Sequence, residues 1–155
     1  EEEKGQQHNI FHTRCLIISK ICRVIVDSGS CNDIASTEMV EMLQLQKKCH
    51  PHPYRMQWLD DCGAIKVISS VQIPISVGTY QDDVECDVVP MHACHLLLGR
   101  PWLHDCDVQI SGRANRLCFV HRGEQFTWLP MTPEEVYLDD MKRKGKKKGE
   151  REQTQ

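Results

Sequence analysis

The sequence predicts a single domain built mainly from β-strands, with one or two short helices. β-branched and apolar residues fill residues 11–18 and 21–26 on either side of Ser19-Lys20, a pattern typical of a hairpin. Between Ile65 and Val77 six apolar residues stand at odd positions, as on the buried face of an extended chain. Three consecutive leucines at 96–98 suit a strand that is buried on both faces. Together these patterns favour an all-β fold.

Length and composition restrict the class of protein. The chain has 155 residues, enough for one domain with a hydrophobic core but few for two. Its net charge of -3 gives no overall reason to bind nucleic acid or an anionic membrane. The longest apolar runs are far shorter than the ~18 residues of a membrane-spanning helix. The acidic start at Glu1 is the opposite of the basic and apolar start of a signal peptide, so we expect an intracellular protein, cytoplasmic or nuclear. From the net charge and the short apolar runs, we expect no membrane or nucleic-acid partner for the domain.

The nine cysteines lack the spacing of a metal or disulfide framework, because none belongs to a Cys-x-x-Cys pair. Their odd number and even spread favour reduced thiols, several of them in the core. The dense clusters His50-Pro51-His52 and His92-Ala93-Cys94-His95 lack the paired spacing of a structural zinc site. We expect neither a metal nor a cofactor.

The elements follow in order from a polar segment, 1–8, that we expect to be disordered. The second strand of the first hairpin ends at Asp27. A short helix is expected next, because Ser36 or Thr37 can cap it. Its apolar residues recur at helical spacing and predict core packing: Met39, Val40 and Leu43.

The middle of the chain predicts a long hairpin and a following strand. The His-Pro-His-Pro run at 50–53 is expected to be a rigid connector, since proline cannot continue a helix. Residues 54–59 predict a strand and 60–63 a turn, and the chain returns through 65–77. Pro74 cannot donate to a ladder, so we expect an edge or an interruption there. Alternating residues at 84–88 then predict a half-exposed strand.

Glycine and proline mark the end of the leucine strand. Gly99 allows another backbone to approach closely, and Pro101 fits the first turn of a short helix that continues through Trp102 and Leu103. A hairpin over 107–110 and 117–120 and a strand at 125–129 are expected to complete the domain.

Past Pro130 the core signal fades. The basic run at 142–148 is typical of a solvated linker, and a nuclear-targeting or nucleic-acid role is the alternative. We therefore predict a disordered segment at 1–8, a folded domain at 9–130 and a charged linker or tail at 131–155.

The stretch Asp27-Ser28-Gly29-Ser30 is the first candidate site. An apolar strand that ends in an aspartate followed by glycine presents a carboxylate on a rigid element, with backbone amides close enough to donate to it. The same composition is also ordinary for a turn after a strand. Both interpretations remain open on these residues alone.

The order of the motifs resembles that of retropepsin-type aspartic proteases: a strand ending in Asp-Ser-Gly, a hairpin with a glycine tip, and later Leu-Leu-Gly before a short helix. In particular, the chain resembles the protease region of plant gypsy-type long-terminal-repeat retrotransposon gag-pol polyproteins. The motifs that carry this likeness lie at 26–31, 57–63, 87–91 and 96–102, and the likeness spans about residues 9–130.

The resemblance implies a closed, barrel-like acid-protease half in which Asp27 is catalytic, Ser28 braces the loop across a dimer and Gly29 donates its amide near the carboxylates. It further implies that Leu97, Leu98, Gly99 and Arg100 support the catalytic loop. The hairpin from Tyr54 to Val67 would be the flap, with Trp58, Asp60, Asp61, Cys62 and Gly63 at its end. Trp58 packs either on substrate or on the buried face.

One departure from the family pattern, at Cys31, and one agreement with pepsin-like enzymes, at Ser30, concern the loop. Many retropepsins carry an acidic residue at the position of Cys31, where it contacts an arginine beyond the Leu-Leu-Gly glycine. The partner of Arg100 is therefore either Asp33 or none. Ser30 stands where pepsin-like enzymes have a serine that bonds the outer carboxylate oxygen.

Only one Asp-Ser-Gly occurs in the chain, so a catalytic pair of aspartates requires a second copy. The sequence thus predicts an aspartic endopeptidase that is active as a homodimer on polypeptides, its own polyprotein in particular. The alternatives are an inactive retropepsin-like dimerisation or binding module, and a zinc or nucleic-acid module that uses the His/Cys pairs and the basic tail.

Overall fold

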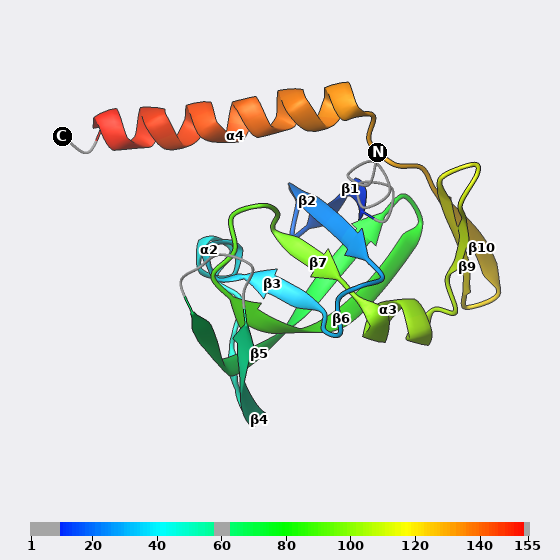
Figure 1. Ribbon diagram of the computed structural model, residues 1–155, viewed down its shortest axis with the longest axis horizontal. Helices are drawn as coiled ribbons and strands as arrows, with labels where there is room; N and C mark the ends of the chain where they lie inside the picture. Colours follow the sequence, from blue (N-terminus) through cyan, green and yellow to red (C-terminus); the bar gives the residue numbers. More distant parts are fainter. Residues whose placement is uncertain (1–9, 58–62, 154–155) are drawn as a thin grey trace.

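The computed structural model describes residues 10–57 and 63–153 (Figure 1). In this part of the chain, the strands form a seven-stranded sheet of order β1-β2-β7-β3-β6-β5-β4 and a three-stranded sheet of order β10-β9-β8. An additional pairing joins β1 to β5 at Leu16 and Ser76, which curls the larger sheet onto itself. The prediction of an all-β fold with short helices is confirmed.

The strands are β1 (Ile10–Ile17), β2 (Lys20–Asp27), β3 (Ile34–Ser36), β4 (Lys48–Gln57), β5 (Ala64–Val77), β6 (Tyr80–Val89), β7 (Leu96–Leu98), β8 (Gln109–Ser111), β9 (Arg116–His121) and β10 (Glu124–Trp128). The helices are α2 (Thr37–Met42), α3 (Arg100–Asp105) and α4 (Pro133–Gln153). Among the described residues no helix is long and apolar enough to span a membrane.

The first hairpin forms as predicted, but its turn lies at Ile18 and Ser19, one residue earlier than Ser19-Lys20. Both turn residues have positive φ, 48° and 66°, which matches the twist of the flanking strands. In β2, side chains alternate between two apolar clusters: Val24 and Val26 join the larger core, and Ile25 joins a smaller one.

The strands β5 and β6 also follow the predicted period of two. The predicted odd-numbered residues of β5 are buried or half-buried. Pro74 lies opposite Asp83 in the β5–β6 ladder, and β5 continues through it without the interruption that was predicted as one alternative.

The rigid connector predicted at residues 50–53 is wrong, because these residues belong to β4. The ladder with β5 shifts register between Cys49 and Tyr54, where the two prolines fall. A proline lacks the amide that a ladder needs but remains compatible with extended chain, so the strand loses pairing there without ending.

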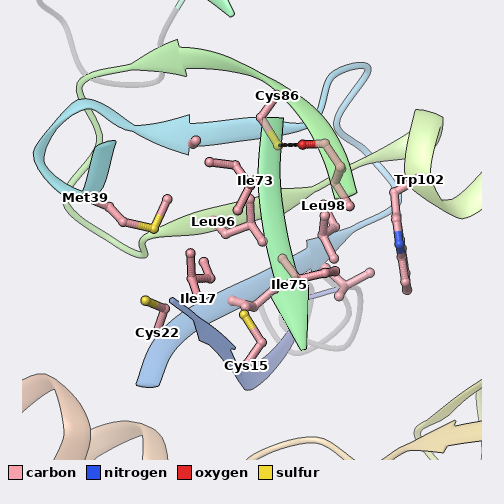
Figure 2. Close-up of a cluster of buried hydrophobic side chains, with 14 of the residues drawn as sticks. Cys15, Ile17, Cys22, Met39, Ile73, Ile75, Cys86, Leu96, Leu98 and Trp102 are labelled. Carbon is pink, nitrogen blue, oxygen red and sulfur yellow. Dashed lines mark hydrogen bonds between the residues drawn. The ribbon is translucent and has the colours of Figure 1, made fainter. Parts of the chain in front are cut away.

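The larger core lies between the strands, and its buried cysteines confirm the prediction of core thiols (Figure 2). Cys22 and Cys86 are each 1% exposed, and the described cysteines are free thiols. Burial raises the pKa of Cys15 to about 12 and that of Cys22 to about 11, so these thiols stay protonated near neutral pH. Trp102 and Trp128 stack at one end of this core, which joins the three-stranded sheet to α3.

Helix α4 is the main element that the sequence analysis does not predict. Between residues 142 and 149, two glycines disfavour a helix by propensity, and the run of like-charged lysines disfavours it by repulsion. Its start is stabilised by a capping box, in which the Thr132 hydroxyl accepts from the Glu135 amide at 3.1 Å and the Glu135 carboxylate accepts from the Thr132 amide at 3.1 Å. Figure 1 shows α4 as a long helix on the outside of the fold, above β1 and β2.

Candidate active site

The candidate catalytic residue Asp27 lies at the end of β2, which is an inner strand of the larger sheet. β2 pairs with β1 on one side and with β7 on the other, where Val26 lies opposite Leu98 in a parallel ladder. The five residues that directly precede Asp27 are buried, whereas Asp27 itself is half-buried. Rigid neighbours on both sides therefore hold a carboxylate that remains partly accessible.

The loop after β2 turns back onto this carboxylate. The Gly29 amide donates to Asp27 Oδ1 at 2.9 Å, and the Ser30 amide donates to the Asp27 carbonyl at 3.1 Å. A side chain at position 29 would place its Cβ 3.2 Å from Asp27 Oδ1, which is tighter than an ordinary contact. The glycine thus allows the backbone to bind the carboxylate closely.

The predicted supporting residues lie beneath this loop. A Cβ on Gly99 would lie 2.7 Å from the Ser30 carbonyl oxygen and still closer to that of Asn32. The Arg100 amide donates to the Ser30 carbonyl at 2.9 Å. The end of β7 and the start of α3 thus pack directly against the active-site loop.

Asp33 is a buried residue beneath the loop, and the sequence analysis misses its hydrogen bonds. Its Oδ1 accepts hydrogen bonds from the Gly99 amide at 2.7 Å and from the Trp102 amide at 3.4 Å, both at the start of α3. Asp33 is 7% exposed, and this burial raises its pKa to about 6 although the two amides act in the opposite direction. Asp33 therefore connects the active-site loop to α3.

The proposed pairing of Asp33 with Arg100 is wrong, because the Asp33 side chain is used by backbone amides. Arg100 is exposed, and its Nε donates to the Ser28 carbonyl at 3.1 Å. The arginine still supports the loop, but it does so through backbone rather than through an ion pair.

The two serines of the loop differ in their surroundings. Ser28 is exposed. The Ser30 hydroxyl donates to the Asn32 carbonyl at 2.9 Å, so it braces the loop instead of bonding the outer oxygen of Asp27 as the family comparison suggested.

The candidate flap is the hairpin of β4 and β5, which pair from Tyr54 and Val67 to Gln57 and Ala64. Gly63 has a φ of 85°, which favours glycine. The other predicted flap residues lie outside the described part of the chain: Trp58, Asp60, Asp61 and Cys62.

A polar cluster anchors the base of this hairpin to β6, and the sequence analysis misses it as well. The Tyr54 hydroxyl donates to Asp87 Oδ2, and His50 Nε2 lies 3.0 Å from Asp87 Oδ1. Burial, together with the Asp87 carboxylate, raises the pKa of Tyr54. The smaller apolar cluster adds packing between the catalytic strand and the hairpin, through Ile25 and Val67.

The fold and the Asp27 loop define a retropepsin-like aspartic protease domain. The family model described as the PEG10/RTL1 protease domain matches residues 23–124, more than half of the chain. The chain belongs to this family. No curated protein matches the sequence significantly.

Solved structures of low sequence identity share the fold. The retroviral protease-like domain of Ddi1 from Leishmania major is 17% identical with a TM-score of 0.59, and the match covers 80% of this chain and 95% of that one. The EIAV protease in complex with the inhibitor HBY-793 is 18% identical with a TM-score of 0.51, covering 64% of this chain and 90% of that one. At these identities the likeness concerns the fold alone.

Proposed function

We propose that the protein is an aspartic endopeptidase that acts as a homodimer, in which each chain contributes one Asp27. The observation that carries this proposal is the Asp27 carboxylate at the end of a buried strand, held by the Gly29 amide at 2.9 Å. The sequence holds one Asp-Ser-Gly, so each chain supplies half of a two-carboxylate site.

The chemistry follows from two such carboxylates at short range. Like charges at this distance cannot both ionise, so the two Asp27 side chains share one proton and titrate as a unit. The ionised carboxylate takes a proton from a water molecule, which attacks the scissile carbonyl. The protonated carboxylate donates a hydrogen bond to the carbonyl oxygen and stabilises the tetrahedral intermediate.

The surrounding residues have supporting roles in this proposal. Ser28 is exposed at the edge of the loop, where it is available to brace the loop of the second chain. Gly99 and Arg100 hold the loop in position from below. The β4–β5 hairpin closes over the substrate and limits the access of water, which strengthens the electrostatic interactions of the shared proton.

The proposed substrate is a polypeptide, the parent polyprotein in particular. This part of the proposal rests on the resemblance to gypsy-type retrotransposon proteases and on the protease-domain family to which the chain belongs.

The test is cleavage of peptides by the purified chain at acidic pH, over a series of protein concentrations. We expect the activity per chain to rise with concentration, because only the dimer contains two aspartates. Asp27→Asn should reduce cleavage by at least about 10³-fold, since both carboxylates of the dimer become amides and neither can take a proton from water. Asp83→Asn, at an exposed position, is the matched control and should retain full activity. Undiminished cleavage by Asp27→Asn contradicts the proposal.

A mixing experiment tests the shared site directly. When wild-type and Asp27→Asn chains are combined in equal amounts and allowed to exchange, only about a quarter of the dimers contain two intact aspartates, if chains pair at random. The activity per wild-type chain should therefore fall to about half. If it stays unchanged, the site lies within a single chain. If the wild-type chain dimerises but cleaves nothing, the protein is a binding module with a protease fold.

A further inference from the structure

The catalytic strand carries a buried arginine on the same face as its aspartate. Side chains along a strand alternate, so Arg23, Ile25 and Asp27 point to one face of β2. Arg23 lies four positions before Asp27, or about 13 Å along the strand. The side chain of Arg23 is only 2% exposed. A guanidinium cannot lose its proton in a protein, so this charge must be neutralised where it lies.

Helix α4 supplies the neutralising charges. Arg23 Nη1 lies 2.6 Å from Asp139 Oδ2 and 3.2 Å from Asp140 Oδ1. Its Nη2 lies 3.1 Å from His12 Nδ1 on β1, and burial together with the Arg23 charge lowers the pKa of His12. The neutral imidazole accepts a hydrogen bond from the arginine.

The same helix holds the segment between β6 and β7. Arg143 donates from Nη1 to the Ala93 carbonyl at 3.0 Å and from Nη2 to the His92 carbonyl at 2.9 Å. This segment is also bonded to the arginine strand, because the Arg23 amide donates to His95 Nδ1 at 2.8 Å and the His95 amide donates to the Arg23 carbonyl at 3.0 Å. One turn of α4 thus contacts β2 and the next contacts the segment beside it.

Two further contacts attach the start of the helix to β1. The Met131 amide donates to the His12 carbonyl at 2.8 Å. Arg14, which lies opposite Arg23 in the β1–β2 ladder, pairs with Glu135 at 3.7 Å. The helix is therefore attached along its first three turns to the face of the hairpin that carries Asp27.

The energetic consequence is asymmetric. Removing one partner of a buried ion pair leaves an uncompensated charge and strongly destabilises a protein, whereas replacing the whole pair with apolar groups is often neutral. Asp139 and Asp140 are 26% and 46% exposed, so water can solvate them without the arginine. Arg23 has no such alternative.

We propose that α4 is an integral clamp of the catalytic strand: Asp139 and Asp140 neutralise Arg23, and Arg143 ties the 91–95 segment, so that residues 131–143 position Asp27. In this respect α4 belongs to the protease domain and is not a linker. The effect on catalysis rests on the proposed function, whereas the clamp itself does not.

The first experiment is a mutational cycle in the full chain. Asp139→Asn combined with Asp140→Asn should lower Tm by about 10 °C, because the buried guanidinium loses its counterions. The control combines Glu41→Gln with Asp83→Asn, which removes the same charge at two exposed positions away from α4 and should change Tm by no more than about 2 °C. In an Arg23→Leu background the two asparagine substitutions should have almost no effect, since no buried charge then needs them. An equal loss of Tm in both backgrounds, or none in the wild-type background, overturns the proposal.

The second experiment measures local opening of the attached segments rather than global unfolding, and it does not require the Arg23→Leu variant to fold. At a temperature where both proteins are fully folded, the double asparagine variant should exchange amide hydrogens faster in 23–27 and 91–95 than the control does. Arg143→Gln should accelerate exchange in 91–95. Unchanged exchange in both segments contradicts the clamp.

The activity measurement separates this inference from the proposed function. If the wild-type chain cleaves peptides, the double asparagine variant should lose kcat by about tenfold or more with little change in KM, because Asp27 is displaced. An unchanged kcat at the folded temperature overturns the positioning role. If the wild-type chain is inactive, the proposed function fails, while Tm and hydrogen exchange still decide whether the clamp exists.

Discussion

Gly99→Ala is the substitution for which the structure makes the sharpest prediction. A methyl group on Gly99 would lie 2.7 Å from the Ser30 carbonyl oxygen, whereas an ordinary contact begins at 3.4 Å. The contact with the Asn32 carbonyl is closer still. Both obstacles are backbone, so the active-site loop must move by about 0.7 Å or more to accept the methyl group.

The cost has two parts. Inserting one methyl group into a packed site costs about 1 to 3 kcal/mol. The displacement also stretches the hydrogen bonds from the Gly99 amide to Asp33 and from the Arg100 amide to Ser30, worth about 1 kcal/mol each. Reduced freedom of the unfolded chain returns about 0.5 kcal/mol. The net loss is about 3 kcal/mol, or about 6 to 12 °C in Tm.

Thermal unfolding of Gly99→Ala and Gly112→Ala provides the assay. Gly112 has no atom within 4 Å of its added Cβ, so this control should unfold within about 2 °C of wild type. Peptide cleavage by Gly99→Ala should fall by about 10²-fold at a temperature where it is folded, because a shift of about 1 Å misplaces the carboxylate. If the two variants unfold at the same temperature, the close packing of Gly99 beneath the loop is refuted.

Three further substitutions test the surroundings of the site. Burial raises the pKa of Asp33 to about 6, so its contribution to stability is full below its ordinary value of 3.8 and is lost as the pH rises through 6. Asp33→Asn imitates the protonated form, so its free energy of unfolding in urea should change less between pH 4 and 6 than that of wild type. The difference should be about 2 to 3 kcal/mol, and parallel pH profiles contradict this. Tyr80→Phe removes the hydroxyl that accepts a hydrogen bond from Trp102 Nε1 at 3.2 Å. Calorimetry should show that the free energy of unfolding falls by about 1 to 3 kcal/mol, because the indole N–H loses its partner. An unchanged free energy would mean that water replaces the hydroxyl. Ser36→Ala removes the cap that accepts from the Met39 amide at 3.1 Å and should cost about 1 kcal/mol in denaturant unfolding; an equal stability would show that α2 does not depend on its cap.

The strands of the fold are predictable because their signal is local. The odd-numbered apolar residues of β5 and the leucines of β7 indicate extended chain whatever lies around them. The prediction for residues 50–53 fails because a proline ends a helix but only interrupts the pairing of a strand. Helix α4 is missed because the capping box of Thr132 and Glu135 is a brief signal for its start. The longer basic run that follows is typical of a solvated tail.

The candidate site also contains local contacts, which the sequence predicts, and distant contacts, which it does not. Asp27 and Gly29 are neighbours in sequence, and the hydrogen bond between them is a property of the turn. Asp33 offers two interpretations in the sequence, a partner for Arg100 or none, and the structure shows a third. Its carboxylate accepts from Gly99, 66 residues away, because the loop folds against the start of α3.

The sequence by itself determines that the chain carries one strand-end aspartate in an Asp-Ser-Gly turn, because turn chemistry and the number of copies can be read from the residues alone. Only the tertiary structure decides what holds that strand. The ion pair between Arg23 and Asp139 joins residues 116 positions apart. A buried arginine and an acidic pair on a distant helix have no common pattern in the sequence, since their energy arises only when folding removes the guanidinium from water.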